Sequence, residues 1–167
     1  MSQQIQYMVN ECRRQEESCL YTSVTLFEWL KALRCWRIVF VVVPIILGAV
    51  ATVPLIAHSH DYEWLTAISA FLAGVFPAIY KALDLDVSLK NVADNAHTFK
   101  VLQDRFRQAR TVTALGTAED FNIQFNELLN RMDAARSSSL TPPERFFLRA
   151  KRKIDAGHYG FEVDNEK

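Results

Sequence analysis

The clearest absence in this sequence is charge along two long apolar runs. Ile38–Ala57, a run of twenty residues, and Trp64–Tyr80, a run of seventeen, contain no Asp, Glu, Lys or Arg. A soluble helix of that length normally carries a polar stripe, whereas about twenty apolar residues match a bilayer core of roughly 30 Å. The short link His58–Glu63 is polar and lacks Lys and Arg. The pattern therefore predicts a two-span transmembrane hairpin, with a buried helical pair in a soluble bundle as the alternative.

The lack of charged residues within the runs also limits the kind of transport. Ion-coupled carriers and proton pumps usually keep ionisable groups at membrane depth, so a coupled transporter is not expected. A pore remains compatible, but two helices cannot enclose a water-filled path, so it would need a homo-oligomer, with a tetramer favoured. Residues Ala70, Gly74 and Ala78 form a small-residue ridge suited to close helix contact, within one hairpin or between protomers. The candidate pore or helix-packing residues are Gly48, Thr52, Thr66, Ser69, Ala70, Gly74 and Ala78.

Cysteine is scarce, and motifs for catalysis or cofactor binding are missing. The three cysteines, Cys12, Cys19 and Cys35, are odd in number and all precede the first apolar run, which argues against a disulfide framework. There is no Gly-rich phosphate loop, no paired cysteine or His-Glu-x-x-His pattern and no nucleophile elbow. We therefore expect no enzyme, no metal site and no cofactor.

The distribution of positive charge predicts the orientation. Of the nineteen Lys and Arg residues, five precede Ile38, fourteen follow Tyr80 and none lies in the link. Because positive charge near membrane ends stays on the cytoplasmic side, both termini are expected in the cytosol and the link outside.

The remaining sequence predicts an all-α protein. Apolar residues from Leu85 to Phe106 recur at spacings of three and four, which favours an amphipathic cytosolic helix continuing the second span. Gly116 breaks this pattern, and Thr117 is a plausible N-cap for the next helix. The apolar face of that helix is expected to contain Phe121, Phe125, Leu128, Met132 and Ala135.

A final helix is expected after a Ser137–Ser139 linker. Thr141-Pro-Pro-Glu144 combines a capping box with proline at the first helical position, and Gly157 supplies a stop after about Ala156. The chain is thus expected to divide into an N-terminal cytosolic helix (1–37), a transmembrane hairpin (38–80), a cytosolic helical region (81–136) and a linker, basic amphipathic helix and tail (137–167).

Two groups of basic residues are candidates for binding an anion. The first lies on the final helix, where no acidic residue occurs between positions 145 and 153: Arg145, Arg149, Lys151, Arg152 and Lys153. This helix could lie on the anionic inner leaflet, bind a nucleotide or nucleic-acid phosphate, or dock on the bundle with its basic side in solvent. The second group comprises Arg105, Arg107 and Arg110, which could instead complement a helix dipole. Convergence of the two groups would favour an anion site.

The layout resembles the SLATT family of bacterial two-span membrane effectors. The resemblance covers roughly residues 20 to 135, and rests on Trp29–Trp36 entering the first run, the hairpin, and Ala96–Phe106 after it. It implies a pore-forming protein of the bacterial inner membrane that acts in antiphage defence. It also implies control by a cytosolic nucleotide or oligonucleotide ligand made by a partner nucleotidyltransferase.

The sequence thus predicts a homo-oligomeric, multi-pass effector that permeabilises the inner membrane. Two alternatives stay open. One is a phage holin-like lesion former, although a holin needs little cytosolic mass. The other is a non-conducting membrane adaptor that scaffolds a soluble partner.

Overall fold

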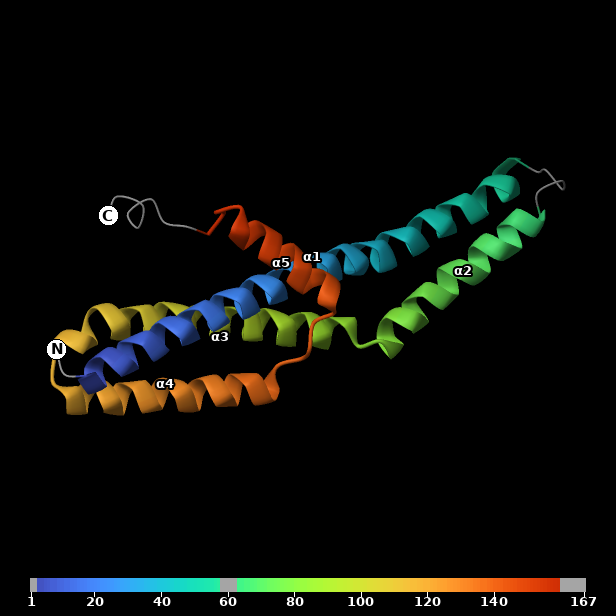
Figure 1. Cartoon of the computed structure of the whole chain (residues 1–167). Coiled ribbons are helices and arrows are strands. Elements are labelled where there is room, and N and C mark those ends of the chain that lie inside the picture. Colours follow the sequence, from blue (N-terminus) through green and yellow to red (C-terminus); the bar gives the residue numbers. More distant parts are fainter. Residues whose placement is uncertain (1–2, 58–62, 160–167) are drawn as a thin grey trace. The chain divides into compact units, whose positions relative to one another are not determined.

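The computed structural model describes residues 3–57 and 63–159, with side chains described for 3–52 and 64–159. The fold is all-α, with helices α1 (Gln3–Ala57), α2 (Glu63–Ala82), α3 (Leu85–Thr111), α4 (Ala118–Ser138) and α5 (Glu144–Asp155) (Figure 1). A short 3-10 turn, η2 (Thr113–Leu115), precedes α4. The chain forms two compact units. One comprises Met1–Leu30 and Lys90–Lys167, which we call the bundle, and the other is Lys31–Leu89, which we call the apolar pair.

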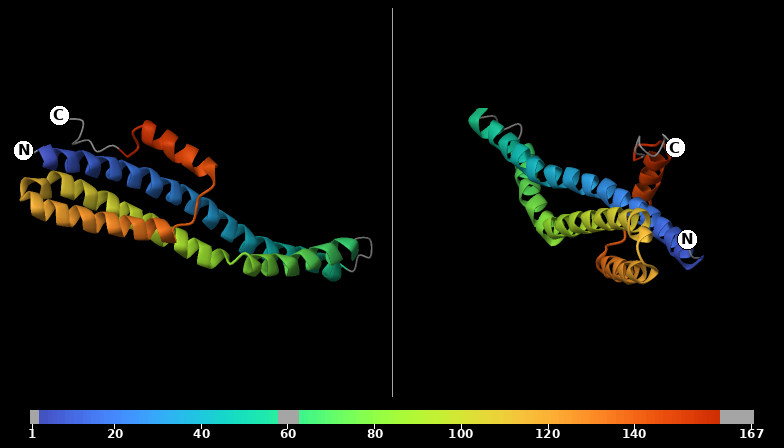
Figure 2. Two further views of the ribbon diagram at one scale, coloured as in Figure 1. Left: turned by 60° about the horizontal axis from the view of Figure 1, so that its bottom comes forward. Right: turned by 90° about the vertical axis from the view of Figure 1, so that its left-hand side faces the viewer.

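The bundle is held together by the apolar stripes that the sequence spacing predicts. The first part of α1 runs alongside α3 and α4 (Figures 1 and 2). On α3, Val92, Ala96 and Phe106 are fully buried, and the Phe106 ring meets the Phe125 ring of α4 at 6.5 Å. The five predicted core positions of α4 are confirmed as buried. Burying a large apolar side chain contributes about 1.5–3 kcal/mol, so these stripes account for the packing of the three helices.

Helix α1 is enclosed on every side near its middle. Four consecutive residues, from Ser23 to Leu26, are each at most 3% exposed, and four successive helical positions point in all directions around the axis. Helix α5 covers part of this surface of α1. Its Phe146 and Ala150 are buried, and its Phe147 ring lies 6.2 Å from the ring of Tyr21. Helix α5 is therefore an integral part of the bundle.

Most of the predicted helix ends of the bundle are confirmed. The Thr117 hydroxyl accepts a hydrogen bond from the Asp120 amide at 3.1 Å, and Gly157 adopts a φ of 79° after α5. The Thr141 capping box is wrong: α5 begins at Glu144, and its N-cap Pro143 has no side chain that can cap it. The first two serines of the predicted linker belong to α4, which continues to Ser138. Their hydroxyls donate to the carbonyls of Ala134 and Ala135, so they do not interrupt the helix.

The apolar pair consists of the later part of α1 lying alongside α2 (Figure 1). The Phe40 ring of α1 contacts the rings of Phe76 and Tyr80 of α2, at 5.7 and 6.3 Å. Both helices are long and apolar enough to cross a membrane, and hardly any of their most apolar stretches is buried. Large side chains such as Ile45 (68%) and Phe71 (69%) remain exposed. Two helices can cover only one face of each other, so the remaining faces of the pair are apolar surface.

The predicted continuation of the second span into the following helix is wrong. Helix α2 ends at Ala82 and α3 begins at Leu85, separated by a two-residue turn. Asp84 takes a left-handed φ of 43°, a conformation that aspartate tolerates better than most residues. Its carbonyl then accepts the Ser88 amide at 3.0 Å and starts the new helix. The sequence has neither glycine nor proline here, so the break carries no strong signal.

Candidate functional site

The basic helix α5 presents most of its cations away from the bundle. The guanidinium carbons of Arg145 and Arg149 lie 4.8 and 5.9 Å from the centre of the Phe146 ring. The ring itself is 2% exposed, whereas both arginines are exposed. Cation–π attraction to a buried ring therefore holds the two guanidinium groups close to the bundle surface and within reach of solvent.

One cation of the helix is used internally. Lys153 Nζ donates to Glu28 Oε1 of α1 at 2.7 Å, and the Glu28 side chain is only 7% exposed. This ion pair directs the positive charge of Lys153 toward α1. Arg145, Arg149, Lys151 and Arg152 are exposed and form no ion pair within residues 3–57 and 63–159.

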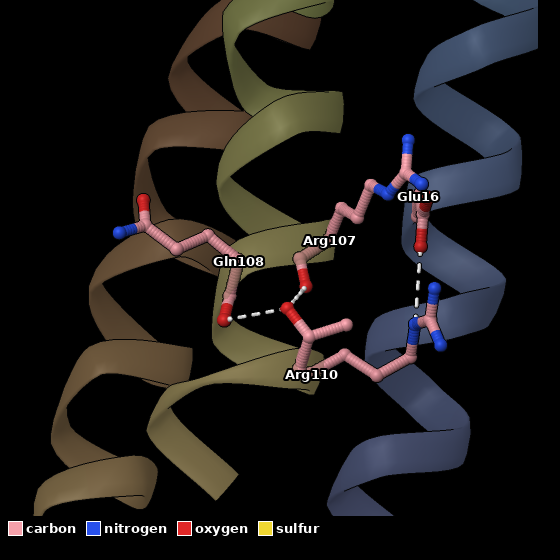
Figure 3. Close-up of polar contacts among 5 residues, drawn as sticks. Glu16, Arg107, Gln108 and Arg110 are labelled. Atoms are coloured by element: carbon pink, nitrogen blue, oxygen red, sulfur yellow. Dashed lines mark hydrogen bonds and ion pairs between the residues drawn. The ribbon is translucent and has the colours of Figure 1, made fainter. Parts of the chain in front are cut away.

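The second basic group is directed at a different carboxylate of α1. Arg110 Nε lies 3.2 Å from Glu16 Oε2, and both side chains are largely shielded. Figure 3 shows the Arg107 side chain also extending toward Glu16. The third member, Arg105, is exposed and donates to Gln108 at 3.1 Å on its own helix. This group therefore secures the end of α3 against α1.

The two basic groups do not form a common site. One is anchored at Glu16 and the other at Glu28, twelve positions apart on the same helix. At 1.5 Å per residue this separation is about 18 Å, too far for a single phosphate to bridge. The convergence that would have favoured one eight-residue anion site is therefore not found.

A groove between α3 and α4 was missed by the sequence reasoning. It encloses about 520 Å³, and its lining residues are Asn95, His97, Thr98, Val101, Leu102, Arg131, Ala134, Ala135 and Ser138. Asn95 is 9% exposed, and its amide donates to the Ser138 carbonyl at 3.2 Å, joining the two helices. In the sequence, the feature that could have indicated this groove is Asn95 itself, a polar residue on the apolar stripe of α3 between Val92 and Phe99.

The hydroxyl residues proposed for a pore lie in different environments. Ser69 is 3% exposed within the apolar pair. The Thr66 hydroxyl is buried and has no hydrogen-bond partner in the described part of the chain. Thr52 is exposed and donates back to the Ala49 carbonyl at 2.7 Å. Of the three, only Thr52 is exposed in the single chain.

The small-residue ridge of α2 lies outside the contact between α1 and α2. Ala70, Gly74 and Ala78 are all exposed, whereas Ser69 is buried. A Cβ atom added at Gly74 would meet nothing within 4 Å, and the same holds for half-buried Gly48 of α1. The ridge is therefore open to another helix.

The two cysteines of the bundle are buried and their thiols are poor acids. Burial raises the pKa of Cys12 to about 11, with Arg110 opposing the effect, and that of Cys19 to about 11, with Arg136 opposing. A neutral buried thiol is a weak nucleophile and a weak metal ligand. Cys35, in the apolar pair, is exposed. Among the described residues, no group of three or more His, Cys, Asp or Glu side chains is placed to hold a metal ion.

Comparison with known proteins gives no further assignment: no protein-family model, curated protein or solved structure matches this chain.

Proposed function

We propose that this protein is a multi-pass effector of the bacterial inner membrane, which permeabilises the membrane as a homo-oligomer. The observation that carries the proposal is the apolar pair. Its two helices combine spanning length with apolar side chains on the faces that they do not cover for each other. In water such a surface would be a large exposed hydrophobic patch, whereas in lipid it requires no further partner. The resemblance to SLATT proteins supports the same proposal of a membrane effector.

The open ridge on α2 supports assembly. Small residues let helix backbones approach closely, and membrane helices associate largely through such packing. Ala70, Gly74 and Ala78 are exposed in the single chain, so a ridge of this kind can serve contact between protomers. Several pairs are required to surround an aqueous path, and a tetramer remains the favoured number.

The proposed cue is a cytosolic nucleotide or oligonucleotide made by a partner nucleotidyltransferase, and the protein itself is not an enzyme. Support for this part comes from the resemblance and from the basic residues of the bundle. Lys153 and Arg110 are paired with carboxylates of α1 that lie twelve positions apart, so a single nucleotide would engage one basic group rather than all eight cations. In antiphage defence, such a ligand would shift the balance between closed and open assemblies by its difference in affinity for the two.

Dye release from liposomes tests the proposed function. Purified full-length protein, reconstituted with an encapsulated fluorophore, should release it faster than protein-free liposomes. Adding a cyclic dinucleotide or a short oligonucleotide should change the rate in either direction. Intact liposomes with the protein verifiably inserted would refute the pore and favour the adaptor, for which the α3/α4 groove offers a surface for a soluble partner.

Thiol labelling in cells tests the orientation. In a Cys35→Ser background, a cysteine replacing Asp61, which lies outside the described residues, should react with a membrane-impermeant maleimide. Cys35 in the unmodified chain should not react in intact cells and should react after permeabilisation. The opposite pattern would place both termini outside.

A further inference from the structure

The outward side of α5 combines a line of arginines with an exposed aliphatic residue. Arg145, Arg149 and Arg152 recur at spacings of four and three, so they share one side of the helix. Leu148 lies three positions after Arg145 and four before Arg152, and is 48% exposed. Basic and apolar side chains are therefore neighbours on the same exposed surface.

The basic side chains of this surface outnumber the acidic ones, because Glu144 and Asp155, both exposed, are the acidic residues of α5 and lie at its two ends. Between positions 145 and 153 there is no acidic residue, and Lys153 is the one cation of this stretch that is ion-paired within the described residues. The buried Phe146 ring keeps Arg145 and Arg149 close to the bundle surface. An anionic partner would meet four exposed cations, two of which are already held in place.

The geometry favours a flat anionic surface over a small soluble phosphate ligand. The basic residues lie on the exposed side of a helix, and the α3/α4 groove is lined by other residues. Leu148 and the 43% exposed Phe147 give a soluble phosphate nothing to bind. A membrane interface accepts both kinds of side chain, because arginines meet lipid phosphates while apolar side chains enter the boundary with the acyl chains.

We propose that α5 is a lipid-contacting helix whose outward side binds the anionic headgroups of a bilayer. Phe146, Ala150 and Lys153 attach it to α1, while Arg145, Arg149, Lys151 and Arg152 face the headgroups. The inference rests on the proposed membrane location. It assigns this basic surface to lipid phosphate, leaving any nucleotide cue to another part of the bundle.

Full-length protein in lipid nanodiscs tests the proposal. In a Cys35→Ser background, a Leu148→Cys substitution would carry the environment-sensitive dye NBD. Cys12 and Cys19 are buried, so the dye reacts at one position. The matched control is the same label at Ile123 of α4, which is 63% exposed and has no arginine within four positions along its helix. Nanodiscs of neutral phosphatidylcholine are compared with nanodiscs containing anionic phosphatidylglycerol.

In anionic nanodiscs, the dye at position 148 should shift to the blue and become protected from dithionite, whereas the dye at 123 should stay aqueous. Replacing Arg145, Arg149 and Arg152 by glutamine should weaken the contact about fivefold per cation removed. Replacing them by lysine should retain the lipid contact, because attraction to an anionic lipid surface depends on positive charge and lysine keeps that charge. Glutamine at Lys100, Arg105 and Arg131 is the control for the loss of three charges elsewhere.

Several outcomes would overturn the proposal. Equal spectra in neutral and anionic nanodiscs would show that α5 does not bind anionic lipid. A shift produced by a short oligonucleotide in neutral nanodiscs, and lost in the lysine variant, would identify a nucleic-acid phosphate site instead. Release of an encapsulated fluorophore from liposomes, reconstituted with the same NBD-labelled variants, separates the two hypotheses. If the encapsulated fluorophore is released while the NBD label at position 148 stays in water, only the lipid contact is refuted. If the NBD label is in lipid but no fluorophore is released, only the pore is refuted.

Discussion

Three polar side chains are buried in the middle of α1, where a simple amphipathic pattern would place them in solvent. Ser23 and Thr25 each donate to a backbone carbonyl of the preceding turn, at 3.0 and 2.7 Å. Glu28 meets the Lys153 ammonium of α5. Burying a polar group is costly unless it is hydrogen-bonded, and these local bonds remove most of that cost. Short hydroxyl residues therefore let α1 be covered on all sides.

The buried thiols give a prediction about reactivity and pH. The pKa of each, Cys12 and Cys19, is raised from 9.0 to about 11 in the folded protein, so both should resist maleimide at pH 7.5 while Cys35 reacts. Above pH 9 the thiols of the unfolded chain ionise while those of the folded chain stay neutral. The free energy of unfolding should therefore fall as pH rises from about 9 to about 11. Mass spectrometry before and after denaturation counts the labelled sites, and two or three labels on the native protein would contradict the burial.

Asp84 gives a prediction about backbone conformation. A left-handed backbone with φ of 43° raises the free energy of the folded state by roughly 1–2 kcal/mol for alanine, whereas glycine adopts it without this penalty. Asp84→Ala should therefore lower the thermal midpoint in detergent, and Asp84→Gly should not. Ser88, a regular helical position in α3, is the control, because there alanine should be more stable than glycine by about 1 kcal/mol. The same order of stability at both positions would argue against a left-handed residue at 84.

Among the helices, α5 is joined to α1 by a partly shielded ion pair in addition to its apolar contacts. Glu28 is 7% exposed and Lys153 is 41% exposed, so their coupling should exceed that of a surface pair. A double-mutant cycle with Glu28→Gln and Lys153→Gln is expected to give about 1 kcal/mol. The exposed pair Glu127–Arg131, with both side chains at 61%, should give only a few tenths. Equal couplings measured by urea unfolding would remove any special role for the α5 pair.

The helices themselves could largely be predicted from the sequence, because apolar spacing and caps are local signals. The stripe of α4 and the Thr117 cap are examples, and the end of the first apolar run and both ends of the second fall within two residues of observed helix ends. The break at Asp84 could not be predicted, because aspartate only tolerates the left-handed conformation. The candidate site was predicted only as a list of cations. Which carboxylate each cation meets depends on tertiary packing, so the sequence does not reveal the pairing of Arg110 with Glu16 or of Lys153 with Glu28.

At the scale of the whole molecule, the ridge on α2 gives a prediction about assembly. Because Gly74 is exposed and a Cβ there meets nothing within 4 Å, Gly74→Leu should leave the apolar pair intact while holding neighbouring protomers apart. Native mass spectrometry or crosslinking in detergent should show a smaller assembly. Gly74→Ala should have little effect, as should Ile79→Phe, which adds bulk on an exposed side of α2 away from the ridge. An unchanged assembly with normal dye release would assign the ridge to lipid contact.

The enclosure of α1 by α5 also has a consequence for synthesis. The Glu28–Lys153 contact joins residues 125 positions apart, so it is among the least local in the chain. At 5–20 residues per second, α1 leaves the ribosome about 6–25 s before its α5 partner exists. During that interval Leu26 and its neighbours lack their final cover, while the apolar runs have already emerged. A nascent chain therefore passes through a stage in which this surface is open to chaperones, and slow translation before Glu144 would prolong it.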